Sequence, residues 1–259
     1  MLTLYEHPLS PFAQKVKIAL FEKGIPFAAV TPDIFGGTTQ EFVTSSPRQE
    51  VPSLIDGDTA VFDSTIILEY IEDKWPTPPL LPATPAERAC VRMLEELCDT
   101  YFEAINWALA EIRVFGRATG PLAEQMVARA GEQIGKMLQR LERDLGGREY
   151  FNGAAFGWGD LSVYPYVAGA TAQGFGPAPG SKLSAWLGRV SQRDSVAKCA
   201  AAAMEAMQGF QNLGPIIEQG LFVREYRDHR LEWMMRSGGQ QIVLDGMAKK
   251  NIRFSVEFS

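Results

Sequence analysis

The sequence has few of the residues that most often bind metal ions or form disulfides. Among its 259 residues there are three cysteines (Cys90, Cys98 and Cys199) and two histidines (His7 and His229). The cysteines form neither a Cys-x-x-Cys pair nor a disulfide framework, and two histidines exclude a histidine-rich metal site. We therefore expect no bound metal, and free thiols in a reducing compartment, the cytoplasm.

Long apolar runs and an excess of positive charge are also absent. No run approaches the roughly 18 apolar residues of a membrane span, and the N-terminus lacks the basic and then apolar segments of a signal peptide. Lys and Arg number 25 against 31 Asp and Glu, so the net charge of -6 gives no attraction to phosphate backbones. The sequence therefore predicts a protein without a membrane span or a nucleic-acid partner.

The first part of the chain alternates strand-like and helix-like segments. Strand patterns cover 2–5, 27–31, 51–55 and 59–62, and helical patterns cover 10–23, about 39–44 and 64–74. Asp56-Gly57-Asp58 is a hairpin turn signal between the last two strands. The order β-α-β-α-β-β-α predicts a small α/β domain.

A proline-rich linker separates this unit from a helical region. Residues 75–85 contain five prolines, which excludes a helix interior or a central strand. Thr84-Pro85-Ala86-Glu87 then combines a capping box with proline at the first helical position. Two apolar stripes at helical spacing follow and predict an all-helical second domain; they are Leu94, Leu97, Tyr101, Ile105, Ala108, Ile112 and Phe115, and Val127, Ala130, Ile134, Leu138, Leu141 and Leu145.

Asp160 lies at the start of another helix and is interpreted as a structural residue. With Gly157 as N-cap, Asp160 occupies the third helical position, where its carboxylate can accept a hydrogen bond from the N–H of the cap. Phe156 and Leu161 are then placed to pack as a hydrophobic staple. This interpretation is preferred over a catalytic carboxylate.

Together these features resemble the cytosolic glutathione transferase superfamily, over roughly residues 1–210. The shared features are the βαβαββα order, Ser10-Pro11-Phe12, Glu50-Val51-Pro52, Asp63-Ser64 and the helical second domain. A serine before Pro-Phe is similar to serine-type classes such as plant tau, and the Phe-Gly-Trp-x-Asp helix start is similar to bacterial relatives near the omega and lignin β-ether-cleaving enzymes.

The resemblance implies a division of the chain into four parts. We expect a thioredoxin-like α/β domain that binds glutathione over 1–75, a linker over 76–85 and an all-α electrophile-binding domain over 86–215. A C-terminal extension, 216–259, exceeds the common core of the family.

Ser10 stands directly before Pro11 and Phe12 at the start of the first helix. One interpretation is a plain N-cap, because Ser-Pro is a common helix opening. The resemblance implies a catalytic role, in which the Ser10 hydroxyl donates a hydrogen bond to the sulfur of glutathione and stabilises the thiolate. A helix N-terminus adds unpaired N–H groups and a favourable dipole at the same place. Both roles are compatible, because the cap position directs the hydroxyl.

The resemblance also implies that Val51, Asp63 and Ser64 bind glutathione. Val51 precedes Pro52, which is cis in the family and turns the Val51 backbone toward the cysteinyl part of the tripeptide. Asp63 would accept from the γ-glutamyl ammonium, and the helix N-terminus at Ser64 would hold the γ-glutamyl carboxylate. The simpler interpretation of Ser64 is a plain N-cap.

Glu50 departs from the family pattern, in which Gln or Lys is frequent before Val-Pro. An acidic side chain does not attract the glycyl carboxylate of glutathione, so we expect that end of the tripeptide to be bound differently. Glu50 and Gln49 remain candidates for glutathione binding. Gln40 is a further polar candidate, with no preference between it and Gln49.

The function implied by the resemblance is transfer of the glutathione thiolate to a small hydrophobic electrophile. Glutathione would be a co-substrate, and the enzyme a cytoplasmic homodimer that acts in detoxification. Glutathione-dependent isomerisation, β-ether cleavage or dehalogenation would use the same site, and a non-catalytic glutathione-binding or scaffold protein is an alternative of another class. Deglutathionylation of the omega type is disfavoured, because it needs a cysteine where Ser10 stands.

The electrophile pocket would lie against the first long helix of the second domain. Its candidate residues are Tyr101, Ile105, Trp107, Ala108, Ile112 and Phe115, although most of this stripe must pack in the core.

The C-terminal extension carries three local patterns. Residues 224–230 are dense in mixed charge, which is typical of a solvated helix, a further helix follows Gly238-Gly239, and 252–258 alternates like a strand. We expect the extension to fold over the cleft between the domains or over a subunit edge. A loosely packed appendage is the alternative.

Overall fold

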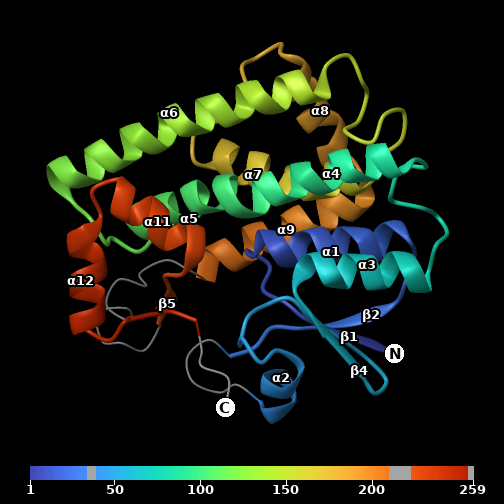
Figure 1. The fold of residues 1–259 in the computed structure, drawn as a ribbon, viewed down its shortest axis with the longest axis horizontal. Helices are drawn as coiled ribbons and strands as arrows, with labels where there is room; N and C mark the ends of the chain where they lie inside the picture. The colour runs from blue at the N-terminus through green and yellow to red at the C-terminus, as the bar shows by residue number, and fades with distance from the viewer. Residues whose placement is uncertain (34–38, 210–222, 256–259) are drawn as a thin grey trace.

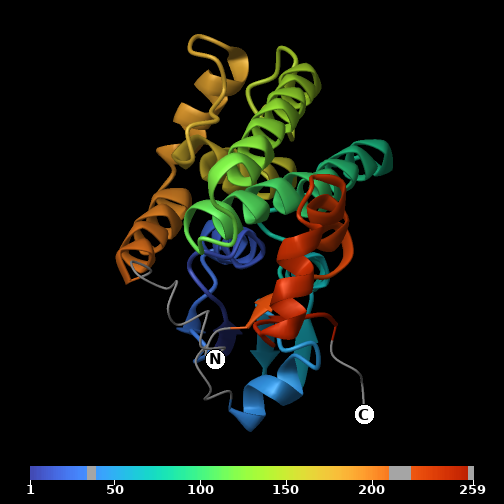
Figure 2. The same ribbon diagram turned by 90° about the vertical axis from the view of Figure 1, so that its left-hand side faces the viewer.

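The computed structural model describes residues 1–33, 39–209 and 223–255. It has an α/β domain, a helical domain and a C-terminal extension that runs from the helical domain toward the sheet (Figures 1 and 2). This confirms the predicted fold class, a thioredoxin-like domain followed by an all-α domain; the numbered domain boundaries stay predictions. Within the described residues, no helix combines the length and the apolar character that crossing a membrane requires.

The sheet of the first domain has the strand order β2-β1-β3-β4. Strand β1 (Leu2–Tyr5) pairs in parallel with β2 (Phe27–Val30) and antiparallel with β3 (Ser53–Asp56). Strand β4 (Thr59–Phe62) pairs antiparallel with β3. The hairpin between β3 and β4 turns at Gly57, whose φ of 60° lies in the left-handed region that favours glycine.

Three helices belong to the first domain: α1 (Pro11–Glu22), α2 (Gln40–Ser45) and α3 (Ser64–Lys74). As predicted, α1 is followed by Gly24, which has a φ of 65°. Helices α1 and α3 lie between the sheet and the helical domain, and α2 lies on the side of the sheet away from it (Figure 1). The N-termini of α1 and α3 therefore lie close to the boundary between the two domains.

The helical domain begins at the predicted capping box. Thr84 and Glu87 accept hydrogen bonds from each other's backbone N–H at 3.3 Å, and α4 (Pro85–Leu97) follows. A π-helical turn, Cys98–Phe102, joins α4 directly to α5 (Glu103–Arg113).

The π-helical turn changes which residues of this segment face the core. A π turn holds more residues than an α turn, so it rotates the apolar stripe around the helix axis. Cys98 and Phe102 are fully buried, whereas Tyr101 is 63% exposed. The prediction that Tyr101 faces the core was therefore wrong, because it assumed an unbroken α-helical period.

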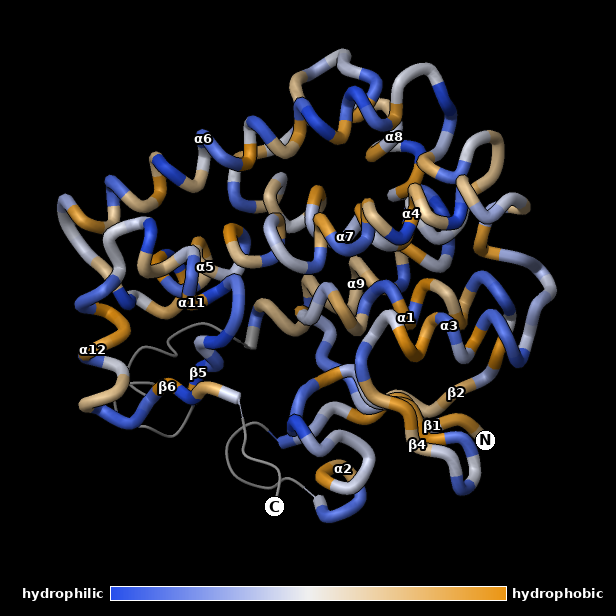
Figure 3. The backbone as a smooth tube through the Cα atoms, viewed as in Figure 1, coloured by the Kyte–Doolittle hydropathy of each residue, from blue (hydrophilic) through white to orange (hydrophobic). Residues whose placement is uncertain are grey.

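Four more helices complete the helical domain: α6 (Gly120–Leu145), α7 (Trp158–Ala172), α8 (Lys182–Ser191) and α9 (Asp194–Gly209). Along α6, apolar and hydrophilic residues alternate at each turn, as expected for a helix with one buried side (Figure 3). In Figure 1, α9 runs beside α1, so both domains contribute to the core around that helix.

The extension contains β5 (Arg224–Glu225), α11 (Asp228–Arg236), α12 (Gln240–Ala248) and β6 (Ile252–Arg253). The predicted helix after the glycine pair is present as α12. Strand β6 is shorter than the predicted strand over 252–258, of which 256–258 lie outside the described residues, and it pairs in parallel with β5.

The expectation of a solvated helix over 224–230 was wrong. Its first residues form β5, and Tyr226 is completely buried. Arg224 and Arg230, which stand on either side of Tyr226, pair with buried acids of the helical domain. Local composition could not show this, because the partners lie more than 100 residues earlier in the chain.

A buried lysine joins α1 to the helical domain. Lys15 is fully buried, and its Nζ lies 2.5 Å from carboxylate oxygens of both Glu95 and Asp99. Glu95 also accepts from the indole N–H of Trp158 at 2.5 Å, and Asp99 accepts from the hydroxyl of Tyr166 at 2.7 Å. Burying the Lys15 ammonium costs free energy because it loses its hydration. The two carboxylates, which are themselves held by further hydrogen-bond donors, compensate this cost.

The structural interpretation of Asp160 is confirmed. Its Oδ2 accepts from the backbone N–H of Gly157 at 3.1 Å, and its Oδ1 accepts from the N–H of Phe151 and the indole N–H of Trp186, each at 2.8 Å. Burial raises the pKa of Asp160 to about 6. The carboxylate therefore satisfies three buried donors from separate segments of the helical domain.

We predict that Asp160→Ala lowers the free energy of unfolding by about 3 kcal/mol, because three buried N–H donors lose their acceptor. Urea denaturation measures this change. The control is Asp245→Ala, since Asp245 is exposed and its carboxylate accepts from Gln241 within its own helix; its effect should stay within about 0.5 kcal/mol. Equal effects of the two substitutions would contradict the structural role of Asp160.

Candidate functional site

Three predicted site segments leave the sheet at the same edge. Tyr5, the last residue of β1, pairs with Ser53, the first residue of β3, and Ser53 pairs with Phe62, the last residue of β4. The segment that carries Ser10 begins after Tyr5, and the loop that carries Val51 ends at Ser53. Asp63 directly follows Phe62. The antiparallel register of β1, β3 and β4 therefore brings together residues that are far apart in the sequence.

Ser10 is the N-cap of α1. Its Oγ accepts a hydrogen bond from the N–H of Ala13 at 3.3 Å, and its own N–H donates to the carbonyl of His7 at 2.8 Å. Ser10 is half-buried. A serine hydroxyl can accept one hydrogen bond while it donates another, so the cap leaves its proton available to an anion at the helix N-terminus.

The loop before β3 is a tight turn closed by Ser46. The Ser46 hydroxyl donates to the carbonyl of Glu50 at 2.8 Å and accepts from its N–H at 3.1 Å. Gln49 has a φ of 54° and donates its N–H to the Ser46 carbonyl at 2.7 Å. The bond between Val51 and Pro52 is cis, as the resemblance implied. Contact of Val51, Gln49 or Glu50 with glutathione stays a prediction.

Asp63 is the N-cap of α3. Its Oδ1 accepts from the N–H of Thr65 at 3.1 Å, and its Oδ2 accepts from the guanidinium of Arg48 at 2.9 Å. Ser64 is the buried first residue of the helix, so the interpretation of Ser64 as the plain N-cap was wrong. Asp63 and the N-terminus of α3 place a carboxylate and backbone N–H groups side by side, which suits an ammonium and a carboxylate of one amino-acid group.

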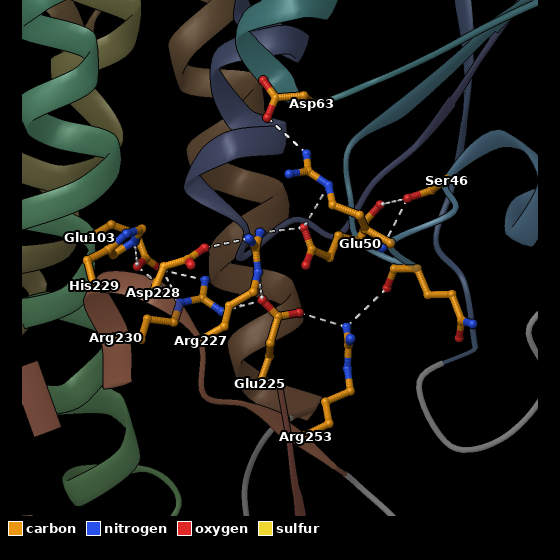
Figure 4. Close-up of polar contacts among 12 residues, drawn as sticks. Ser46, Glu50, Asp63, Glu103, Glu225, Arg227, Asp228, His229, Arg230 and Arg253 are labelled. Carbon is orange, nitrogen blue, oxygen red and sulfur yellow. Dashed lines mark hydrogen bonds and ion pairs between the residues drawn. The ribbon is translucent and has the colours of Figure 1, made fainter. Parts of the chain in front are cut away.

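Glu50 lies among charged residues of the loop and of the extension (Figure 4). Its Oε2 lies 2.8 Å from the guanidinium of Arg227 and 3.6 Å from Nε of Arg48. Burial, together with the neighbouring carboxyl of Glu225, raises the pKa of Glu50 to about 7, although Arg227 and Arg48 act in the opposite direction. The cations of Arg227 and Arg48 therefore offset only part of the effect of burial and of Glu225 on the Glu50 carboxylate.

Comparison with known proteins identifies the family. The models "Glutathione S-transferase, N-terminal domain" and "Glutathione S-transferase, C-terminal domain" match residues 4–79 and 124–189. Glutathione S-transferase U25 of Arabidopsis thaliana is 31% identical over 195 residues, which cover 73% of this chain and 84% of the relative. The chain belongs to the glutathione S-transferase superfamily. Probable glutathione S-transferase GSTU1 of Oryza sativa subsp. indica is 30% identical over 211 residues, covering 76% of this chain and 88% of the relative.

Solved structures of glutathione S-transferases and related proteins have the same fold. Rice GST1 (OsGSTU1) in complex with glutathione superposes with a TM-score of 0.68 at 28% identity, covering 83% of this chain and 97% of the rice chain. FzlA from C. crescentus superposes with a TM-score of 0.67 at 25% identity, covering 77% and 92% of the two chains. Neither family model reaches the C-terminal extension.

The extension covers the face of α5 that was predicted to bind the electrophile. Tyr226 packs edge-on against Trp107 at 4.6 Å between ring centroids, and the guanidinium of Arg224 lies 4.2 Å from the ring centre of Phe115. Glu111, completely buried, accepts from the side chains of both Arg224 and Tyr226, at 2.5 and 2.6 Å. Trp107 and Phe115 are therefore buried beneath the extension, and the candidates Ile105, Ala108 and Ile112 of α5 are also buried.

The covering segment also lies close to the turn before Ser10. Burial, with the positive charges of Arg224 and Lys17, lowers the pKa of His7, which is three residues before Ser10. His7 is thus held neutral at physiological pH. The expectation that the extension folds over the region between the domains agrees with these contacts.

Sequence reasoning missed Arg48, Arg227 and the covering role of Tyr226. One signal was available: Glu103 and Glu111 each stand four residues from Trp107, one before it and one after it, on the apolar side of the predicted helix. Acids on a core-facing stripe need cationic or hydroxyl partners. Within 1–33, 39–209 and 223–255, no group of three or more His, Cys, Asp or Glu could hold a metal ion.

We predict a pH-dependent contribution of Glu50 to stability. The pKa of Glu50 is raised from 4.5 to about 7 in the folded chain, so its contribution is fully present below the unfolded pKa and is lost as the pH rises through 7. The variant Glu50→Gln has no ionisable group at this position, so its stability does not fall in this way as the pH rises. The unfolding free energy of the wild type minus that of the variant should therefore fall between about pH 5 and pH 8, by at most about 3 kcal/mol.

Urea denaturation at several pH values measures the difference. Glu232→Gln is the matched control, because Glu232 is an exposed glutamate of α11 that pairs with Arg236 one turn later in the same helix. A pH-independent difference for Glu50→Gln would show that Glu50 ionises normally in the folded protein.

Proposed function

We propose that this glutathione S-transferase binds glutathione at the sheet edge that carries Ser10, Val51 and Asp63, and transfers its thiolate to a small electrophile. The observation that carries this proposal is the aligned register of β1, β3 and β4, which gathers a helix-capping hydroxyl and a second helix N-terminus. The rice relative solved in complex with glutathione supports the choice of ligand.

Ser10 is the residue to which we assign thiolate stabilisation. An ordinary cysteine thiol has a pKa near 8.5, and lowering it by about 2 units requires about 2.7 kcal/mol of preferential stabilisation of the anion. A charge-assisted hydrogen bond from the Ser10 hydroxyl and the dipole of α1 are together of this magnitude. Ser10 acts as a donor and does not itself become a nucleophile.

The remaining candidates are assigned to the peptide parts of glutathione. The backbone of Val51 binds the cysteinyl part, Asp63 accepts from the γ-glutamyl ammonium, and the α3 N-terminus at Ser64 holds the γ-glutamyl carboxylate. Gln49 and Glu50 lie in the loop nearest the glycyl end.

The electrophile is proposed to be small and hydrophobic. Leu9, Pro11 and Phe12 flank the Ser10 hydroxyl and are half-buried, so they offer apolar surface at the reacting sulfur. The aromatic face of α5 lies beneath the extension. Transfer of glutathione to such molecules is chemistry suited to detoxification in the cytoplasm, where thiols stay reduced.

The covered face of α5 favours a second candidate function. A protein of this fold that binds glutathione without transferring it needs no open electrophile pocket. Such a binding or scaffold protein would retain glutathione and catalyse no conjugation. Retention on immobilised glutathione together with a thiol-conjugation assay separates the two candidates.

We also propose a homodimer. Ile66 of α3, Met93 of α4 and Tyr101 of the π turn are 56%, 64% and 63% exposed. Arg92 of α4 pairs with Glu69 of α3 at 2.6 Å, so these helices are neighbours. Large apolar side chains exposed on neighbouring helices are typical of a contact surface.

We predict that Met93→Asp converts the dimer to a monomer, because it places a charge in an apolar contact. Sedimentation velocity measures the change. Met247→Asp alters a methionine of α12 that is 52% exposed and should leave the mass unchanged. A monomeric wild type, or a dimer that survives Met93→Asp, would contradict this surface.

We predict that at about pH 6.5 Ser10→Ala lowers kcat about 10- to 100-fold while the Kd for glutathione changes less than about threefold, because the lost hydrogen bond is strongest to the thiolate. Steady-state conjugation kinetics and calorimetry measure the two quantities. Ser181→Ala is the matched control. Ser181 caps α8 by accepting from Ser184 N–H at 3.1 Å, so this substitution removes a similar cap far from the site. Wild-type turnover in Ser10→Ala would refute the role of Ser10.

A further inference from the structure

The extension is anchored on two buried acids of α5. Arg230 donates to Glu103 with Nε at 3.0 Å and a terminal nitrogen at 2.6 Å, and Tyr226 donates to Glu111 at 2.6 Å. Both acids are at most 3% exposed. Charge-assisted hydrogen bonds in such surroundings are strong, so the segment between these anchors is held in place.

Arg227 lies between the two anchors and reaches across to the first domain. Its NH2 lies 2.8 Å from Glu50, its Nε 2.5 Å from Glu225 and its NH1 2.6 Å from Asp228 (Figure 4). All three guanidinium nitrogens are thus used on carboxylates of the protein. This arrangement suits a bridge between two segments better than a direct contact with a ligand.

The bridge continues into the proposed glutathione site. Glu50 is 3.6 Å from Nε of Arg48, and Arg48 donates to Asp63 at 2.9 Å. Arg227, Glu50, Arg48 and Asp63 therefore alternate in charge along one chain of contacts. The chain joins the extension to the loop of Val51 and to the cap of α3.

The same loop has a second contact with the extension. Arg253 donates to the carbonyl of Gln49 at 3.4 Å and pairs with Glu225 at 2.7 Å. Glu225 in turn binds Nε of Arg227. The loop is therefore held from the extension at two successive residues, Gln49 and Glu50.

We propose that Arg227 is a positioning residue for glutathione: it holds the loop that presents Val51 and, through Glu50 and Arg48, the carboxylate of Asp63. The inference rests on the proposed function and adds that the binding site is incomplete without the C-terminal extension. A loop held in its binding conformation has less conformational entropy to lose when the ligand binds, so its affinity is higher. Loss of the bridge should weaken glutathione binding about tenfold.

The test compares Arg227→Gln with wild type at about pH 8, where Glu50 is ionised. Calorimetry gives the Kd for glutathione and for γ-glutamylcysteine, which lacks the glycyl carboxylate. We expect both affinities to fall about tenfold, with kcat at saturating glutathione little changed. Arg236→Gln is the matched control, because Arg236 is the last residue of α11, the helix that begins directly after Arg227, and pairs with exposed Glu232; it should change neither affinity.

Two results of this comparison would overturn the proposal. Unchanged affinities in Arg227→Gln would show that the bridge does not position the site. A loss for glutathione with none for γ-glutamylcysteine would mean that Arg227 contacts the glycyl carboxylate directly. Glu50→Gln cuts the same bridge from the other side, so the double variant should lose no more affinity than either single variant; additive losses would contradict a shared bridge.

Hydrogen exchange of the unliganded protein provides a readout that needs no ligand. Arg227→Gln should speed amide exchange in residues 46–51 and leave α8 unchanged, whereas unchanged exchange in 46–51 would refute the holding step. If the wild type bound neither peptide, the proposed function would fail, and the exchange data alone would decide whether Arg227 holds the loop.

Discussion

The ion pairs of Lys15 are the interaction on which the arrangement of the site depends. Lys15 lies one and a half turns after Ser10 on α1, and Glu95 and Asp99 hold it from the helical domain. Because the pairs are buried, the position of α1 between sheet and helices is set by charge as well as by apolar packing. The N-terminus of α1, and with it the Ser10 hydroxyl, is thereby fixed relative to both domains.

The site combines this fixed helix with two segments whose positions depend on the sheet and on the extension. The register of β3 with its neighbours sets where Val51 and Asp63 leave the sheet. The extension places the guanidinium of Arg227 beside Glu50, and it covers the aromatic face of α5 with Tyr226. Both the loop that carries Val51 and the side of α5 proposed to face the electrophile are therefore in contact with a segment that the two family models leave unmatched.

Much of the local structure could be predicted from the sequence, because its causes are local. The capping box at Thr84, the carboxylate of Asp160 and the glycine after α1 depend on residues a few positions apart. The π turn at Tyr101 and the burial of Tyr226 depend on packing between distant segments, which spacing and composition do not contain. The candidate site residues were placed through resemblance, and their partners across the domains were not predictable from local patterns.

The proposed function depends on the first turn of α1, where the Ser10 hydroxyl would stabilise the thiolate of bound glutathione. The most direct measurement is a pH titration of the ultraviolet absorbance of the thiolate in the complex of glutathione with the wild-type protein. We expect the thiol to titrate about 2 units below the ordinary value near 8.5 and to return toward that value when Ser10 is replaced by alanine. A bound thiol that titrates like a free one would contradict the account.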